Sequence, residues 1–360
     1  MKKEPGIIIV KVGTNILTAN GDKLNRSLIR NLVKQLVELH NMGYKSVLVT
    51  SGAVAAGKEI TKLSDNMESI TQRQIYAAVG QARLMHEYEK LFQKLGVVVG
   101  QALLTREDFA DRTRYDNALR ALYGMINNNI VPIINENDVV TVEELSFGDN
   151  DVLAAATAIA LNADKLLLLT NQEGVMTANP EKNKRDAKLI RNIKDVNEIF
   201  SAISDNSSST HGIGGMHSKV NAAQLSANAG IPTWIANGLH PENITAIING
   251  KKIGTNLIAK VSKLSEKERW ILCAKNASAG IIIDDGAAQA LLKKKSLLMV
   301  GVKKIRGCFD KKEIVEVVDR RENIVGYGIT NYSSDELTKA LDRPHSLKKE
   351  VIHINNLHIA

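Results

Sequence analysis

Six short runs of consecutive apolar residues recur at intervals along the first two thirds of the chain. They cover residues 6–12, 45–50, 97–104, 130–135, 165–170 and 231–236. The stretches between them are amphipathic, and in residues 27–40 the leucines 28, 32, 36 and 39 fall on one helical face. Further helices are expected over residues 70–95, 115–129, 150–162 and 216–229. Because continuous apolar runs suit strands buried on both faces, the alternation predicts an α/β sandwich with a mainly parallel sheet.

The character of the sequence changes after residue 262. Residues 263–276 are rich in charge and are expected to form a linker or a short helix. From 277 to 360, short apolar runs alternate with turn residues, which is typical of a small β-rich domain. We therefore expect a large domain over residues 1–262 and a small one over residues 277–360.

Composition narrows the class of protein. The chain has 360 residues, of which 44% are apolar and 24% charged, a balance typical of a soluble globular protein. The formal net charge of +8 is spread along the chain, so it favours a mildly basic protein over a nucleic-acid binder. Two cysteines are too few for a disulfide framework, and no apolar run is long enough for a membrane span. The apolar patch near the start is interrupted by Lys11 and resembles a strand more than a signal peptide, which predicts a cytoplasmic protein.

Polar motifs follow four of the predicted strands. They are KVGTN after the first strand, TSGAVAAG after the second, NENDVV after the fourth and TNQEG after the fifth. Each motif alone could be turn chemistry, since turns require Gly, Asn, Asp and Ser. Ligands of parallel sheets gather at the carboxyl ends of strands, so the four motifs together predict one binding crevice.

Two of these motifs carry features that suit an anion. Lys11 ends a predicted buried strand, where a lysine is costly unless it meets a negative charge, and Gly13 would let the backbone approach that charge. The alternative is a lysine that extends along the strand end to solvent. Ser51 and Gly52 lie at a strand-to-helix turn whose N–H groups favour an anion, although Ser51 could simply cap the helix.

Amides and carboxylates cluster after the fourth strand. They are Asn135, Asp138, Asp149, Asn150 and Asp151. Such a set could bind a metal ion, but Mg²⁺ usually takes few protein ligands when substrate phosphates are present. It also suits an amino-acid ligand, whose ammonium group needs acceptors and whose carboxylate needs donors.

The stretch GIGGMHSKV, residues 212–220, places three glycines close together and Lys219 one helical turn after the last of them. The stretch departs from the usual phosphate loop, in which the lysine follows the final glycine directly. Lys219 and Lys11 would bring two cations from distant parts of the chain to one crevice. Phosphoryl transfer relies on such positioning and charge neutralisation.

The motifs KVGTNIL, VTSGAVAAG, VPIINENDVV, GDNDVLAA, KLLLLTNQEGVMTANP and GIGGMHSK, in this order and spacing, resemble the glutamate 5-kinases of the amino acid kinase family. The segment GIIIDDGAAQALLKKKSLLMVGVKKIRGCF is similar to the PUA domain found in many bacterial members. The resemblance implies ATP-dependent phosphorylation of the γ-carboxylate of L-glutamate, the first step of proline biosynthesis, with Mg²⁺ bridging the ATP phosphates. It further implies a homo-oligomer, proline as feedback inhibitor and transfer of the product to glutamyl phosphate reductase. RNA binding by the PUA-like domain is not expected.

The resemblance also implies roles for individual residues. Lys11 and Lys219 would stabilise the transferring phosphoryl group, and Asp151 would orient both lysines. Glutamate would be bound by Ser51, Asp138 and Asn150, with Gly52 and Asn135 nearby. The nucleotide would contact Lys11 and a further set of residues: Thr170, Asn171, Ile213, Gly214, Gly215, Met216, His217, Ser218 and Lys219.

The positions at which this sequence departs from the family pattern lie in the motifs that are expected to bind the nucleotide, whereas the residues expected to bind glutamate match the pattern. Asn171 replaces an aspartate, Ile213 a threonine, His217 a small residue, Ser218 a second threonine, Met176 an aromatic residue and Asn179 an aspartate. These replacements predict a change in the affinity or preference for the nucleotide, and less change in which acceptor substrate is bound. They also leave open a second class of protein, a regulatory or RNA-binding protein on a decayed kinase scaffold. The presence of Lys11, Asp151 and Lys219 argues against that class.

Overall fold

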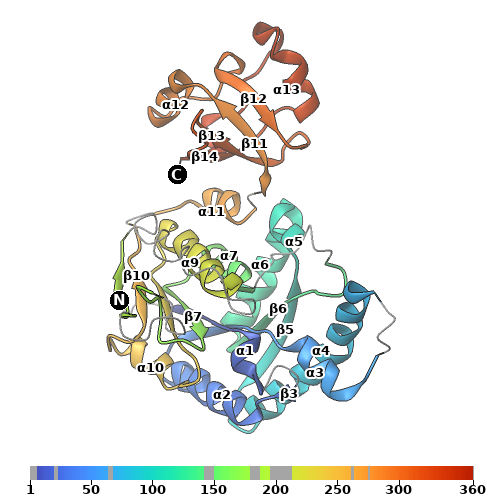
Figure 1. Ribbon diagram of the computed structural model, residues 1–360, viewed down its shortest axis with the longest axis vertical. Helices are drawn as coiled ribbons and strands as arrows, with labels where there is room; N and C mark the ends of the chain where they lie inside the picture. The colour runs from blue at the N-terminus through green and yellow to red at the C-terminus, as the bar shows by residue number, and fades with distance from the viewer. Residues whose placement is uncertain are drawn as a thin grey trace. The chain divides into compact units, whose positions relative to one another are not determined.

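The computed structural model describes residues 6–19, 23–63, 68–141, 150–178, 187–194, 213–260, 263–274 and 276–359. The contacts within the chain divide it into two units. The N-terminal unit comprises residues 1–106 and 117–262, and the C-terminal unit comprises residues 107–116 and 263–360. Both units are shown in Figure 1.

An eight-stranded sheet forms the centre of the N-terminal unit, in the order β5-β6-β4-β1-β7-β9-β10-β8 (Figure 1). The strands are β1 (Ile7–Val12), β4 (Lys45–Val49), β5 (Val98–Leu104), β6 (Ile130–Glu136), β7 (Lys165–Thr170), β8 (Asn192–Ile193), β9 (Thr233–Asn237) and β10 (Thr255–Leu257). All pairs from β5 to β9 are parallel, whereas β10 runs antiparallel to β9. The six predicted strands and the mainly parallel sheet are therefore confirmed, and the short β8 and β10 are additions.

Helices cover the sheet. They are α1 (Thr14–Leu17), α2 (Arg26–Asn41), α3 (Ala53–Ile60), α4 (Ser69–Gln93), the part of α6 (Arg112–Asn127) from residue 117 onward, α7 (Asn150–Ala160), α9 (Ile213–Asn228) and α10 (Asn243–Ile248). Helix α5 (Arg106–Ala110) and the start of α6 belong to the C-terminal unit, except for Arg106. The leucine face predicted for α2 is buried, and Asn25 caps the helix by accepting from Leu28 N at 3.1 Å. Helix α9 begins at Ile213 rather than 216, so Gly214 and Gly215 lie in its first turn and not in a preceding loop.

Two glycines let helices α3 and α4 pack with their backbones in contact. A Cβ atom on Gly57 would overlap the carbonyl oxygen of Tyr76, and a Cβ atom on Gly80 would overlap that of Ala53. No side chain can be accommodated at either crossing point without moving a helix. This contact holds the first half of α4 beside the end of β4, where the crevice was predicted.

Gly80→Ala is expected to destabilise the N-terminal unit by about 3 kcal/mol, because the added methyl group forces two packed backbones apart. Gly124→Ala is the matched control, since Gly124 is an exposed glycine in α6 with nothing near its would-be Cβ. Alanine there should stabilise the helix by about 0.5–1 kcal/mol. Urea unfolding followed by circular dichroism would measure both changes. Equal behaviour of the two variants would contradict the packing account.

The C-terminal unit is built on a five-stranded sheet in the order β12-β11-β13-β14-β15. Its strands are β11 (Asn276–Ile283), β12 (Val302–Arg306), β13 (Ile314–Val318), β14 (Ile324–Ile329) and β15 (Leu357–Ile359). Its helices are α11 (Glu266–Cys273), α12 (Asp285–Leu292) and α13 (Ser334–Ala340). The predicted β-rich domain is thus present. Helix α12 was not predicted; Asp284 caps it by accepting from Ala287 N at 2.8 Å.

Helix α11 lies in the predicted linker and packs against residues 107–116 within the C-terminal unit. The indole of Trp270 donates to the carbonyl oxygen of Phe109 at 3.0 Å. The Arg112 guanidinium lies over the rings of both Tyr115 and Trp270, at 5.6 and 5.2 Å from their centroids, and pairs with Glu266 at 2.6 Å. A segment far away in the sequence therefore belongs to this unit.

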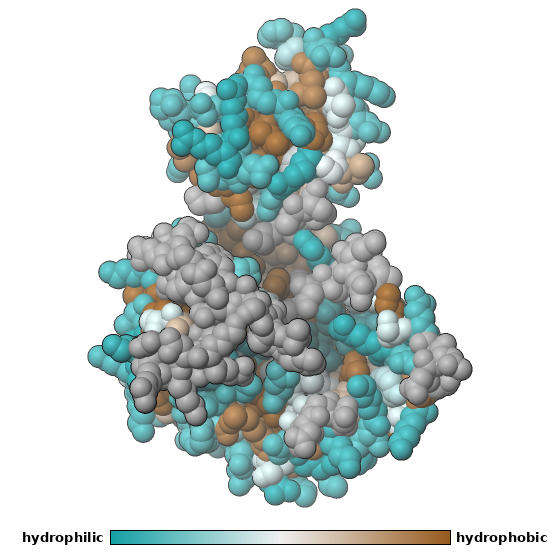
Figure 2. Space-filling model, viewed as in Figure 1, coloured by the Kyte–Doolittle hydropathy of each residue, from teal (hydrophilic) through white to brown (hydrophobic). Residues whose placement is uncertain are grey.

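Hydrophilic side chains cover most of the described surface that faces the viewer in Figure 2, around smaller apolar areas. None of the described helices is both long and apolar enough to cross a membrane.

Candidate active site

The ends of four parallel strands meet in the middle of the large sheet. Strand β1 lies between β4 and β7, and β6 pairs with β4 on the far side. Their carboxyl ends carry Lys11, Ser51, Asn135 and Thr170, each within two residues of the last strand residue. The polar motifs that follow the strands therefore converge at one edge of the sheet, as the alternation predicted.

A buried carboxylate holds two lysines together. Asp151, in the first turn of α7, is fully buried; its Oδ1 lies 2.6 Å from Lys11 Nζ and its Oδ2 lies 2.8 Å from Lys219 Nζ. The exposed fractions of the lysines are only 2% and 9%. Two positive charges facing one negative charge leave a net charge of +1 at a site largely removed from water, which favours an anion.

The lysines line a cavity of about 200 Å³, which we call the lysine cavity. The described residues around it come from β1, α1, the end of β4, β7 and α9: Lys11, Gly13, Thr14, Asn15, Ile16, Ser51, Leu169, Thr170, Asn171 and Lys219. Five of the predicted site residues are therefore together here: Lys11, Ser51, Thr170, Asn171 and Lys219.

A second cavity of about 220 Å³, which we call the amide cavity, adjoins the first and shares Thr14 and Ser51 with it. It is lined by Thr14, Ser51, Gly52, Ala53, Val54, Arg73, Asn135, Glu136, Asp138 and Asn150. All five residues predicted to hold the acceptor are in this set. Gly52 has φ of +101°, a conformation that favours glycine, and directly precedes α3.

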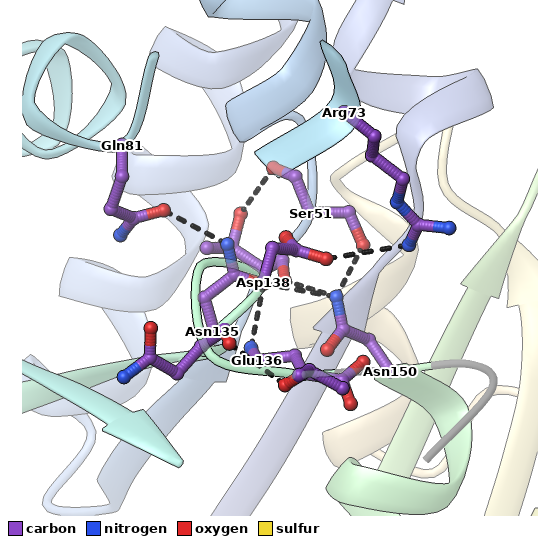
Figure 3. Close-up of polar contacts among 10 residues, drawn as sticks. Ser51, Arg73, Gln81, Asn135, Glu136, Asp138 and Asn150 are labelled. Carbon is purple, nitrogen blue, oxygen red and sulfur yellow. Dashed lines mark hydrogen bonds and ion pairs between the residues drawn. The ribbon is translucent and has the colours of Figure 1, made fainter. Parts of the chain in front are cut away.

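A chain of amide hydrogen bonds fixes which atoms face the amide cavity (Figure 3). Asn135 Nδ2 donates to Gln81 Oε1 at 2.9 Å, so Asn135 Oδ1 is turned to accept from Asn150 Nδ2 at 3.0 Å. Asn150 Nδ2 also lies 2.9 Å from Ser51 Oγ and from Thr50 O. Asn150 Oδ1 is buried and has no donor among the described residues. The Ser51 hydroxyl hydrogen remains available to donate, because its oxygen is the acceptor in this chain.

Arg73 reaches from α4 toward the carboxylate of Asp138, as Figure 3 shows, with Nη2 3.3 Å from Oδ1. Asp138 lies in the turn after β6, and 17% of its side chain is exposed, against 63% for Arg73. Burial raises the pKa of the Asp138 carboxyl, and the Arg73 guanidinium offsets part of that rise.

Some predicted residues do not line either cavity. Met216, His217 and Ser218 lie in α9, and the His217 ring is exposed and contacts Asn221 Nδ2 at 3.1 Å. For Ile213, Gly214 and Gly215 the structure describes the helical backbone. Asp149 and Asn179 lie outside the described residues.

Sequence reasoning did not single out Arg73, Gln81 or Glu136 as site residues. Arg73 and Gln81 lie on a helix whose packing against α3 depends on glycines, a signal that apolar periodicity does not carry. Glu136 ends β6 directly after Asn135 and could have been found as part of the NENDVV motif.

Comparison with known proteins identifies the chain. The model of the amino acid kinase family matches residues 6–237. The chain belongs to the amino acid kinase family. Glutamate 5-kinase of Salmonella paratyphi B is 42% identical over 92% of this chain and 90% of its own length. The same values hold for glutamate 5-kinase of Enterobacter sp. strain 638.

Two further comparisons concern the architecture of this amino acid kinase. The PUA domain model matches residues 280–354, within the C-terminal unit. A carbamate kinase structure from Giardia lamblia, bound to AMP-PNP, superposes with a TM-score of 0.52 at 19% identity and covers 71% of this chain and 99% of that one. At this identity the likeness establishes the fold only.

Proposed function

We propose that this chain is a glutamate 5-kinase, which transfers the γ-phosphoryl group of ATP to the γ-carboxylate of L-glutamate. The observation that carries the proposal is the pair of adjoining cavities that share Ser51 and Thr14, one lined by two lysines and the other by amides and carboxylates. Relatives with this activity that are 42% identical over most of the chain support it. They do not favour a decayed scaffold with a regulatory or RNA-binding role.

Glutamate fits the amide cavity with its ammonium group at the acceptors. Asp138 and the buried Oδ1 atom of Asn150 are two acceptors among the residues that line the cavity. The γ-carboxylate would then lie at the shared border, where the Ser51 hydroxyl can donate to it and Lys11 is nearby. Gln81 and Asn135 would act by holding the Asn150 amide in the orientation that this binding mode needs.

The phosphates of ATP fit the lysine cavity. An oxygen of the γ-carboxylate forms the bond to the γ-phosphorus, the bond from that phosphorus to the bridging oxygen breaks, and ADP leaves with the electron pair. Lys11 and Lys219 would offset the charge of the transferred group while Asp151 holds both ammonium groups in place. The nucleophile is already an anion, so no general base is required.

Mg²⁺ bound to the ATP phosphates would supply further charge neutralisation. The described residues contain no cluster of three His, Cys, Asp or Glu side chains that could hold a metal ion. The residues that line the lysine cavity fit an ion held mainly by the nucleotide, because Mg²⁺ retains waters and phosphate oxygens as ligands. Thr170 and Asn171 would contact the nucleotide from the end of β7.

The test is ATP-dependent formation of the γ-glutamyl hydroxamate, in which hydroxylamine displaces phosphate from the acyl phosphate. L-Glutamate, L-aspartate and N-acetyl-L-glutamate would be compared as acceptors. We expect product with L-glutamate and a kcat/KM at least about 100-fold lower with the others, since each disturbs one end of the amide cavity. Equal use of aspartate or acetylglutamate would contradict the assignment of the acceptor, and no product with any acceptor would contradict the kinase activity itself.

Several predictions of the sequence accompany this proposal. Inhibition by proline, homo-oligomerisation, transfer of the acyl phosphate to glutamyl phosphate reductase and a cytoplasmic location stay predictions. The division into a kinase domain over residues 1–262, a linker over 263–276 and a PUA-like domain over 277–360 is likewise proposed.

A further inference from the structure

The charges around the amide cavity are unequal. Of the described residues that line it, Glu136 and Asp138 are acidic, and Arg73 alone is basic. The proposed substrate brings an ammonium group and an α-carboxylate next to each other, besides the γ-carboxylate that reacts. The ammonium group has acceptors in Asp138 and Asn150, whereas the α-carboxylate needs a cation or several N–H donors.

Arg73 is placed to provide that cation, but in this structure it pairs with Asp138. The separation of 3.3 Å is longer than the usual 2.7–2.9 Å of a charge-assisted hydrogen bond, and most of the Arg73 side chain is exposed. An ion pair of this kind contributes little stability. It can therefore be exchanged at low cost when a ligand offers both groups better partners.

The N-terminus of α3 supports an anion at the same place. Ala53 and Val54, the first two residues of the helix, line the amide cavity, and the N-cap residue Gly52 has no side chain that could accept from their N–H groups. The free N–H groups of this eight-residue helix carry partial positive charge. Arg73 and these N–H groups thus line the same cavity from two helices, α4 and α3.

We propose that Arg73 binds the α-carboxylate of the acceptor amino acid and leaves Asp138 when the substrate ammonium group arrives. Arg73 is then the residue that selects an α-amino acid over an analogue without the α-carboxylate. The inference rests on the proposed function, because it assumes that the amide cavity holds the acceptor.

The test compares L-glutamate with its α-amide, in which the α-carboxylate is neutral and the γ-carboxylate is retained. In Arg73→Gln we expect KM for L-glutamate to rise about 10- to 100-fold, the loss of one charge-assisted contact, with kcat within about threefold. KM for the α-amide should stay the same or fall, since the arginine no longer competes for Asp138. Arg73→Lys should restore part of the affinity for L-glutamate, because it keeps the charge and loses the forked geometry.

Arg83→Gln is the matched control. Arg83 is on the same helix, pairs with Glu87 at 3.3 Å, is 44% exposed and does not line the amide cavity. It should leave KM for both acceptors unchanged. Circular dichroism of all variants would establish that each is folded.

The pH profile gives an independent readout. Asp138 must be charged to bind the ammonium group, and the ionisable lining residues beside it are Arg73 and Glu136. Removing Arg73 removes the influence that lowers the pKa of Asp138, so the fall of kcat/KM on acidification should begin at higher pH in Arg73→Gln than in the wild type. The ionisation of glutamate itself is the same for both enzymes and cannot produce this difference.

Two outcomes would overturn the inference. One is an unchanged KM for L-glutamate in Arg73→Gln, and the other is a KM for the α-amide that rises in this variant as much as the KM for L-glutamate. Failure of the proposed function is seen separately, as absence of any product from the wild type. In that event calorimetric binding of L-glutamate to the wild type and Arg73→Gln still tests the role of Arg73.

Discussion

Lys219→Met is expected to lower kcat for phosphorylation of L-glutamate by about 100- to 1,000-fold. Lys219 lies 2.8 Å from Asp151, lines the lysine cavity and is 9% exposed, so its charge acts where water screens it little. Negative charge moves onto the transferring phosphoryl group and the bridging oxygen during the reaction, and a lysine next to them stabilises that arrangement more than the ground state. Methionine keeps an unbranched apolar stem and removes the ammonium group, with its charge and its hydrogen bond to Asp151.

The measurement is hydroxamate formation under saturating ATP and L-glutamate, with kcat and both KM values determined. Lys34→Met is the control, because Lys34 is exposed on α2 and does not line either cavity. A kcat of the Lys219→Met enzyme within about threefold of the wild-type value would refute the role in charge stabilisation. A rise in the KM for ATP with unchanged kcat would show that Lys219 binds ground state and transition state equally.

Asp151→Asn is expected to have the second large effect, on stability as well as on activity. The carboxylate is fully buried between Lys11 and Lys219, and asparagine removes the negative charge that offsets both ammonium groups. Breaking a buried pair in this way costs about 3–5 kcal/mol, and here two pairs share the acceptor. The midpoint of urea unfolding should fall accordingly, and kcat should fall about 100-fold because the lysines lose their fixed positions.

A ligand effect distinguishes this explanation from a simple packing defect. ATP would place phosphates beside the two lysines, so it should restore part of the stability of Asp151→Asn and shift its unfolding midpoint more than that of the wild type. Asp116→Asn is the control: Asp116 is 38% exposed and pairs with Arg112 at 3.0 Å, and its loss should cost at most about 1 kcal/mol. An unfolding midpoint of Asp151→Asn equal to that of the wild type would contradict the proposed charge balance.

Much of the fold was predictable from short-range patterns. The apolar runs at 45–50 and 165–170 are the strands β4 and β7, and the leucine spacing of residues 27–40 is the buried face of α2. Predictions failed for elements that are very short, and for a helix whose start is marked by a single N-cap residue instead of by apolar periodicity. Helix α12 begins after Asp284, in a stretch for which the sequence predicts short strands, and the three-residue β10 has too few residues for a period to be visible.

The candidate site was partly predictable for a different reason. Parallel strands bring their carboxyl ends to one edge, so the polar motifs after β1, β4, β6 and β7 had to meet once the sheet was parallel. The resemblance to the amino acid kinase family then indicated roles for some of the residues in those motifs. It could not indicate Arg73 or Gln81, which lie in helix α4 and belong to none of the quoted motifs.

The sequence by itself determined the six longer strands of the large sheet, the five longest helices of the N-terminal unit and the set of polar residues at the strand ends, because these depend on neighbours a few positions apart. The tertiary structure alone decided that Arg73 pairs with Asp138, 65 residues away, and that the Gln81 amide orients Asn135 and through it Asn150. Both contacts depend on how closely α4 approaches α3, and that distance is set by the Gly57 and Gly80 crossing. A contact of this kind arises from the packing of two backbones, which no local pattern of side chains specifies.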